Sequence, residues 1–285
     1  RKDREDKLLA GQLWVRLVKK TRIIRDSVVD CPTGDWRSAL AAACRAQESG
    51  AARFENTHYT ATVTADSGGL LGTLTSRATG EPLAQGMMIY TDYGVYEARG
   101  MVGTSAGSVE GFTARREGEA LVTSVEGRLV GAPAEGQPSL RYRAELRFDE
   151  SPAIHVAVTL SPEMTRKGAR GFLALAWAMP AMTRWRLRTL DGLLRHTYRE
   201  EGETARSYSR EWPLDPDRPL IAATTAGGAE LRIENLKWSG TPAFTGPVIH
   251  GRMLFLCWLD GWPRDIEAGR HAKLDFDLVT AVAGR

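Results

Sequence analysis

The chain has 285 residues, with 38 basic and 35 acidic side chains and a formal net charge of +3 at pH 7. This balance is too even to predict nucleic acid or an anionic membrane as the partner, because both attract strongly basic surfaces. The length suits one main domain, and no apolar run approaches the roughly 20 residues that cross a bilayer, so we expect a soluble chain with no membrane partner.

We predict that the first 50 residues form a helical segment, and that residues 51–285 form a separate β domain. Leucines recur at the four-residue spacing of one helix face: Leu9, Leu13 and Leu17. A second helix is predicted after Asp35, because Asp is a good N-cap and an alanine-rich stretch follows it. The chain begins with Arg1, so we expect that processing, truncation or excision has removed a preceding part.

From about residue 53 the apolar period changes to the two-residue period of a strand. The segment 140–148 alternates without a break between apolar and charged residues. Similar alternation marks four further segments: 120–130, 153–160, 231–238 and 273–279. Asp191-Gly192 predicts a tight hairpin. The expected strands exceed the ~10 that one open sheet holds, so the fold is predicted to be mainly β, a large antiparallel β super-sandwich preceded by the short helical segment.

The stretch from residue 54 to residue 83 predicts a strand, a glycine turn, a second strand and a polar turn. Gly68-Gly69 allows positive φ in the first turn. Inward side chains are expected at Val63, Leu71 and Leu74. The stretch resembles the first hairpin of β super-sandwich domains in carbohydrate-active enzymes. The resemblance rests on Glu55, Asn56, Tyr59, Gly68, Gly69, Leu70, Thr79 and Gly80.

Within that class, the segment is most similar to the C-terminal β-region of family 38 glycoside hydrolases, the α-mannosidases, inside the wider galactose mutarotase-like fold class. The resemblance implies a β-domain that contacts carbohydrate and supports catalysis. Such an α-mannosidase carries its zinc ion and carboxylate nucleophile on a preceding α/β barrel, for which this chain has no counterpart. We therefore expect no cofactor in this chain, zinc on an absent catalytic domain, and a separate catalytic chain or domain as partner.

Two other functions remain open from the sequence. One is a stand-alone sugar enzyme: a mutarotase-like epimerase that uses a histidine and a carboxylate, or a polysaccharide lyase that uses the arginine, tyrosine and histidine residues around 184–212. The same basic and aromatic residues could instead form a salt-bridged surface hairpin with the glutamates among them. The other open function is a non-catalytic module that binds carbohydrate or protein.

The segment 257–265, with the sequence CWLDGWPRD, is the main candidate for sugar contact. Indole rings offer flat apolar faces, carboxylate and guanidinium groups bind hydroxyls, and functional residues concentrate on loops. The expected carbohydrate-binding residues are Trp258, Asp260, Trp262 and Arg264 here, and Asp92 and Tyr93 in the stretch 91–99. The alternative interpretation is that Trp258 ends a buried strand and Trp262 packs over the sandwich edge.

The sequence assigns no catalytic residue. The segment GTSAG fits the nucleophile-elbow pattern, but no helical stripe follows Ser105, so a glycine-rich loop is expected there. Asp275 and Asp277 lie two apart on a predicted strand and are expected on its solvated face. His155 is expected on the outer side of its strand, and His271 could act as a general base if it pairs with a carboxylate.

The histidines and cysteines predict no metal site, because they are isolated in sequence and match no metal-binding spacing. The three cysteines, Cys31, Cys44 and Cys257, are too few and too widely spaced for a disulfide framework. We expect Cys44 and Cys257 to be small core residues. They do not decide the cellular compartment.

Overall fold

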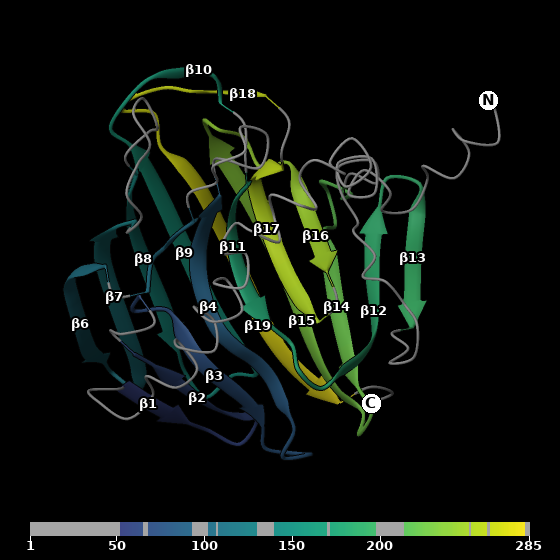
Figure 1. The fold of residues 1–285 in the computed structure, drawn as a ribbon. Helices are drawn as coiled ribbons and strands as arrows, with labels where there is room; N and C mark the ends of the chain where they lie inside the picture. The colour runs from purple at the N-terminus through teal and green to yellow at the C-terminus, as the bar shows by residue number, and fades with distance from the viewer. Residues whose placement is uncertain are drawn as a thin grey trace, which may run out of the picture.

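A computed structural model describes residues 52–64, 68–92, 102–106, 108–129, 140–169, 172–197, 214–250, 252–260 and 263–282. The predicted helical segment 1–50 lies outside these residues. The regular structure in the described part of the chain consists of strands (Figure 1). This part of the chain contains no helix of the length and apolarity that crossing a membrane requires.

The first sheet has eight strands, in the order β1-β2-β3-β4-β11-β17-β16, with β5 beside the C-terminal end of β4. All its pairings are antiparallel. Its strands are β1 (Ala52–Glu55), β2 (Tyr59–Val63), β3 (Leu71–Ser76), β4 (Pro82–Asp92), β5 (Val102–Thr104), β11 (Phe172–Ala178), β16 (Gly246–His250) and β17 (Met253–Asp260). Gly68 and Gly69 precede β3 with φ values of 82° and 70°, as predicted for this turn.

The second sheet has nine strands, in the order β13-β12-β14-β15-β19-β9-β8-β7-β6, again all antiparallel. Its strands are β6 (Val109–Glu117), β7 (Ala120–Arg128), β8 (Leu140–Phe148), β9 (Ala153–Pro162), β12 (Met182–Thr189), β13 (Gly192–Thr197), β14 (Leu220–Thr225), β15 (Ala229–Gly240) and β19 (Ala272–Val282). A separate ribbon pairs β10 (Arg166–Ala169) with β18 (Arg264–Ile266). The predicted super-sandwich of two packed sheets is confirmed.

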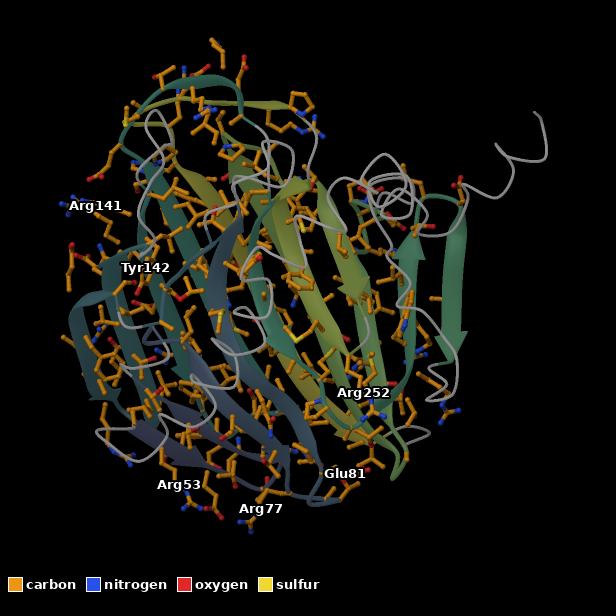
Figure 2. The ribbon with its side chains drawn as sticks, in the orientation of Figure 1. Arg53, Arg77, Glu81, Arg141, Tyr142 and Arg252 are labelled. Carbon is orange, nitrogen blue, oxygen red and sulfur yellow. The ribbon has the colours of Figure 1, made fainter. Side chains whose placement is uncertain are left out.

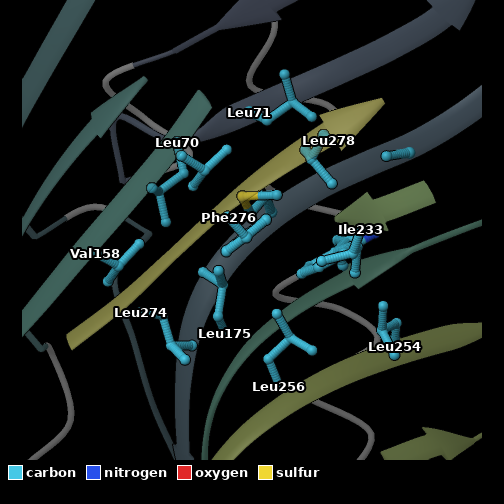
Figure 3. Packing of buried hydrophobic residues seen from close by; sticks show 14 of the residues in the cluster. Leu70, Leu71, Val158, Leu175, Ile233, Leu254, Leu256, Leu274, Phe276 and Leu278 are labelled. Atoms are coloured by element: carbon cyan, nitrogen blue, oxygen red, sulfur yellow. The ribbon is translucent and has the colours of Figure 1, made fainter. Parts of the chain in front are cut away.

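The two sheets bury one continuous core between them (Figure 3). In β8 the burial pattern alternates along the whole strand, as the sequence predicts, and Leu140 to Phe148 contribute every second side chain to the core. Val63, Leu71 and Leu74 also point inward as expected. Burying each leucine-sized side chain contributes about 1.5–3 kcal/mol, so this alternation supplies the main force that holds the sheets together.

The eight-stranded sheet is apolar on both faces. In β11, Leu173, Leu175 and Trp177 join the core between the sheets, whereas the alternate residues Ala174 and Ala176 belong to a second buried cluster. We call this second group the outer cluster; its members are Met88, Tyr90, Ala174, Ala176, Val248, Met253, Phe255 and Cys257. The prediction that Cys257 is a small core residue is confirmed, while Cys31 and Cys44 lie outside the described residues.

The predicted hairpin at Asp191-Gly192 forms between β12 and β13, with its turn displaced by one residue. Thr189 pairs with Gly192, so the two turn residues are Leu190 and Asp191. Gly192 closes the turn with a φ of 126°, in a region that side chains with a Cβ rarely adopt. The sequence therefore located the hairpin but not its register.

Asn56, one of the residues that carry the family resemblance, joins the two sheets. Its Nδ2 donates to the carbonyls of Asp149 (2.8 Å) and Ser151 (3.0 Å), which lie in the turn between β8 and β9. Its Oδ1 accepts from the backbone N–H groups of His58 (2.8 Å) and Tyr59 (2.9 Å) in its own turn. One buried amide thus connects a turn of the eight-stranded sheet with a turn of the nine-stranded sheet.

Glu81 makes a second connection between the sheets, at the lower end of Figure 2. Its carboxylate accepts hydrogen bonds from Thr225 Oγ1 (2.5 Å), at the end of β14, and from the Gly227 N–H (2.9 Å). A Cβ at Gly227 would lie 2.5 Å from this carboxylate, so a larger residue there would displace the Glu81 side chain. The hydrogen bond from Thr225, aided by that from Gly227, lowers the pKa of the Glu81 carboxyl.

Replacing Asn56 with alanine should lower the free energy of unfolding by about 2 kcal/mol, because buried backbone acceptors and donors lose their partner. Denaturant unfolding of the two proteins measures the difference. The matched control is Thr57→Ala, at the exposed neighbouring position, which should change stability by less than about 0.5 kcal/mol. Equal stabilities for the two variants would show that Asn56 does not join the sheets.

The contribution of Glu81 to stability should depend on pH. Since its pKa is lower in the folded than in the unfolded protein, the stabilisation is present above the ordinary value of 4.5 and is lost as the pH falls through the folded pKa. Glu81→Gln should therefore be less stable than the parent by about 1 kcal/mol at pH 7, with a smaller gap in acid. Glu119→Gln, in the exposed β6–β7 turn, is the control and should show no such gap.

Candidate carbohydrate-contact site

Two of the predicted binding segments meet at one end of the eight-stranded sheet. β4 ends at Asp92, β17 ends at Asp260, and β11 begins between them at Phe172. Phe172 pairs with Asp92 on one side and with Asp260 on the other. Because neighbouring strands lie about 4.8 Å apart, the backbones of the two aspartates are about 10 Å apart. Residues 168 positions apart in the sequence, from 92 to 260, thus share one row of the sheet.

The ribbon of β10 and β18 extends the β11–β17 pair beyond this row. β10 leads into β11 and β18 follows β17, and Ala169 pairs with Arg264. In Figure 1 the ribbon lies at the top of the molecule, above the ends of the long strands. Arg264 is thereby held at the same end of the sheet as Asp92 and Asp260.

Asp265 holds the two strands of the ribbon together. Its Oδ1 accepts the backbone N–H of Gly168 (2.9 Å) and its Oδ2 accepts Lys167 Nζ (3.1 Å). The hydrogen bond from Gly168, followed by that from Lys167, lowers the pKa of this carboxyl. The neighbouring Arg264 is half-buried, and its Nε–H is buried without a hydrogen-bond partner in the described part of the chain. A hydroxyl or carboxylate acceptor would offset the cost of that unsatisfied donor.

Trp258 does not belong to this site. It lies within β17, its side chain is fully buried, and it packs in the core between the sheets. The pairing of β11 with β17 shifts between Leu173 and Ala174, so that Leu259 and Cys257 have partners and Trp258 is the extra residue of a bulge. Trp258 is buried in a strand, as the alternative interpretation holds, although the strand continues to Asp260. Its expected role on a sugar-binding loop is wrong, because no face of the indole is exposed to a ligand.

The predicted sugar contacts of Asp92, Asp260, Tyr93 and Trp262 stay predictions. The structure places the backbones of Asp92 and Asp260, while the side chains of both, together with Trp262 and Tyr93, lie outside what it describes. The two described segments that flank Trp262 end at Asp260 and begin again at residue 263. The position of Trp262 in the sequence is therefore between the sheet end and the ribbon.

A second polar group forms on the outer face of the nine-stranded sheet, where β9 pairs with β19. His155 lies opposite Asp277, with Nδ1 at 3.0 Å from Asp277 Oδ1, and its Nε2 is 3.6 Å from Asp275 Oδ2. The other oxygen of Asp277 accepts Asn235 Nδ2 at 2.7 Å. Asn235 has a φ of 55° and lies where the pairing of β15 with β19 shifts.

An imidazole beside a carboxylate can transfer protons to and from a bound substrate, which is the chemistry of general acid–base catalysis. Both ring nitrogens of His155, however, face carboxylates of its own sheet. The sequence correctly places Asp275 and Asp277 on the solvated face of their strand. The sequence does not predict the contact of these aspartates with His155, because that contact depends on which strand pairs with β19 and in which register.

Other sequence candidates have structural partners. His271 Nδ1 lies 2.9 Å from Ser161 Oγ, a hydroxyl rather than the carboxylate that a general base was expected to need. Arg186 pairs at 2.6 Å with the buried carboxylate of Glu230, which lies outside the segment 184–212, while the glutamates within that segment lie outside the described residues. Among the described residues, no group of three or more histidines, cysteines or carboxylates is suited to a metal ion.

Ser105 is a structural residue rather than an exposed nucleophile. It follows the short strand β5, its side chain is fully buried, and its Oγ accepts the backbone N–H of Ile89 at 3.0 Å. Tyr142, labelled in Figure 2, donates to the carbonyl of Gly68 (3.3 Å), and burial raises the pKa of its hydroxyl. The expected glycine-rich loop is found only in part, because Gly103 and Thr104 belong to β5 while Ser105 and Ala106 follow it outside the strand.

No protein-family model matches this chain, and neither does any curated protein. A solved galactose 1-epimerase from Lactobacillus acidophilus NCFM superposes with a TM-score of 0.50 at 8% identity, over 81% of this chain and 94% of that one. The chain has a galactose mutarotase-like fold. A GalM/aldose epimerase homologue from C. elegans superposes over 82% of this chain and 99% of that one, with a TM-score of 0.49 and 10% identity.

The left-handed backbone of Asn235 generates a stability prediction. Asn235→Gly should cost no more than about 1 kcal/mol, for the hydrogen bond to Asp277 that both variants lose, since glycine adopts positive φ without strain. Asn235→Val should cost about 1–2 kcal/mol more than Asn235→Gly, because a β-branched residue is strained there. Lys237→Val, an exposed site in the same strand with an ordinary φ, is the control, and thermal unfolding of the three variants measures the effect. A valine at position 235 as stable as glycine would contradict this account.

Proposed function

We propose that the chain is a carbohydrate-active β super-sandwich domain that contacts saccharide where β4 and β17 end and β11 begins. The observation that carries the proposal is the single row formed by Asp92, Phe172 and Asp260. Two segments predicted separately from their residue types come together there, next to the ribbon that carries Arg264. Binding sites commonly lie on loops and strand ends that a rigid scaffold positions.

The finer proposal is that this domain is the β-domain, or a relative of the β-domain, of an α-mannosidase-like glycoside hydrolase. The first hairpin supports this proposal. Asn56, which carries part of the resemblance, connects the two sheets, and the same connection would serve in other domains with this pair of sheets. A separate catalytic chain or domain would be the partner. The zinc ion and the carboxylate nucleophile that the resemblance implies would belong to that partner.

In this proposal the chain supplies binding groups. Carboxylates of Asp92 and Asp260 accept hydrogen bonds from sugar hydroxyls, and the guanidinium of Arg264 donates them. Tyr93 directly follows Asp92 in the sequence, and Trp262 follows Asp260 by two residues. In this proposal both supply aromatic faces for the apolar side of a sugar ring. A group of this kind orients a glycan while the partner breaks the bond.

A stand-alone epimerase is the second candidate, and one observation favours it. His155 and Asp277 form a histidine–carboxylate pair at 3.0 Å, the combination that the sequence analysis required of a mutarotase-like enzyme. The solved structure with a TM-score of 0.50 is also a galactose 1-epimerase. Against it, the second ring nitrogen of His155 faces Asp275, so the imidazole has carboxylates of the protein on both sides. A lyase or a non-catalytic module remains an outcome of the test.

The test combines binding and turnover with the purified chain. Calorimetric titration with mannose-containing oligosaccharides should detect binding, and Asp260→Asn or Asp92→Asn should weaken it about tenfold, a loss of about 1.4 kcal/mol. Asp191→Asn, on the exposed β12–β13 turn, is the matched control and should bind as the parent does. The chain alone should not hydrolyse aryl mannosides, with or without added zinc.

Turnover measured on the chain alone would contradict the proposal. Loss of the α-to-β interconversion of galactose in His155→Gln, followed by polarimetry, would establish the epimerase. An unsaturated product absorbing in the ultraviolet from a uronate polysaccharide would establish a lyase. Absence of saccharide binding in the parent would remove the carbohydrate-contact site itself.

A further inference from the structure

Trp238 and Phe244 form a half-buried aromatic pair, with ring centroids 5.1 Å apart and planes at 43°. Of the aromatic side chains that the structure describes, only these two and Phe112 are not buried. In the other ring pairs between described residues both rings are buried, as for Trp177 and Phe276. The pair of Trp238 and Phe244 therefore differs from the aromatic contacts of the core, because it reaches solvent.

This pair lies at the end of the molecule that carries the candidate carbohydrate-contact site. β17 ends there at Asp260, the ribbon strand β18 follows, and β19 then begins at Ala272. Ala272 pairs with Gly240, the last residue of β15, and Trp238 lies two residues before that strand end. Phe244 follows in the short connection from β15 to β16. The two rings are thus contributed from the point where the chain passes from one sheet to the other.

The connection that carries Phe244 is held at both of its ends. Gly240 has a φ of 93°, and a Cβ at this position would overlap the backbone just before β19, so glycine lets the chain turn out of β15. At the other end, Thr245 donates its N–H (2.8 Å) and its Oγ1 hydroxyl (3.1 Å) to the carbonyl of Cys257. Cys257 precedes Asp260 by about 10 Å along the strand. Phe244 is therefore fixed near the end of β17.

Each of the two rings covers the core only in part. Both side chains pack against the core between the sheets, and Trp238 lies opposite the buried Leu274. Because both are half-buried, some of their apolar surface stays in water, at a cost of about 25 cal/mol for each Å². A sugar ring that lies on this surface removes that cost. A ligand across the end of the sandwich can touch these rings and the last residues of β4 and β17 together, since the strands end there.

We propose that Trp238 and Phe244 form an aromatic platform of the saccharide site, on which the apolar face of a sugar ring lies. This inference rests on the proposed function and adds two binding residues to it. The platform supplies the aromatic surface that Trp258, buried in the core, does not offer. Because its connection is held at both ends, the platform is ordered before the ligand arrives, and binding costs little conformational entropy.

Calorimetric titration of the full chain with mannose-containing oligosaccharides tests the platform. Trp238→Leu and Phe244→Leu keep an apolar side chain over the core and remove the flat ring, so each should weaken binding about tenfold. Trp238→Phe keeps an aromatic ring and should bind nearly as the parent does. Phe112→Leu is the matched control, because Phe112 is the third half-buried aromatic residue and packs against the same core from the edge strand β6. Its affinity should equal that of the parent.

The outcomes separate a binding role from a purely structural one. If the rings only cover the core, denaturant unfolding should show that all three leucine variants lose stability, while their affinities stay at the parent value. Parent-like affinity in folded Trp238→Leu and Phe244→Leu would therefore overturn the platform. The proposed function would survive that result if Asp260→Asn still weakened binding. Absence of saccharide binding in the parent would overturn both.

A second measurement decides the case in which the leucine variants do not fold. Hydroxyl-radical footprinting of the unmodified chain, read by mass spectrometry, reports the solvent access of each aromatic side chain. Saturating oligosaccharide should lower the oxidation of Trp238 and Phe244 about twofold, because a bound sugar ring excludes water from them, and should leave that of Phe112 unchanged. Unchanged oxidation of both rings, in a preparation that binds saccharide by calorimetry, would overturn the platform.

Discussion

The contact between the inner faces of the two sheets is the constraint on which the other features depend. At its centre the ring of Trp177, from β11, stacks on that of Phe276, from β19, with centroids 6.3 Å apart and planes 12° from parallel. Side chains alternate with a period of two, so a slip of one residue in either strand would turn these rings to the outside. The core thereby fixes which polar residues face solvent, including His155 and both aspartates of β19.

The element types could be predicted from the sequence because this alternation is local. The segment 140–148 forms β8 with the same boundaries, and the aspartates of 273–279 face outward in β19. Strand order and register could not be predicted, since any two strands with one apolar face can pair equally well on local grounds. The meeting of Asp92 with Asp260, and of His155 with Asp277, follows from that non-local choice.

Residue type alone was a poor guide to accessibility at Trp258. Tryptophan suits both a sugar platform and a core, and the deciding feature is the alternation of β17, in which Leu254, Leu256 and Trp258 face the core between the sheets. The residues that carry the family resemblance show the opposite case. Asn56 is part of the sequence resemblance, and in the structure its side chain forms hydrogen bonds that connect the two sheets. Its presence therefore predicts how the domain is held together rather than what the domain binds.

The position of β19 has a consequence for how the chain reaches this structure. This strand is the last one described along the chain, yet it lies in the interior of the nine-stranded sheet, between β15 and β9. Until residues 272–282 are available, the sheet exists as two halves with open apolar edges. Formation of the domain is therefore a late, non-local event, which slows folding and leaves earlier intermediates prone to associate with other chains. A ribosome-bound chain would need protection by chaperones until β19 emerges.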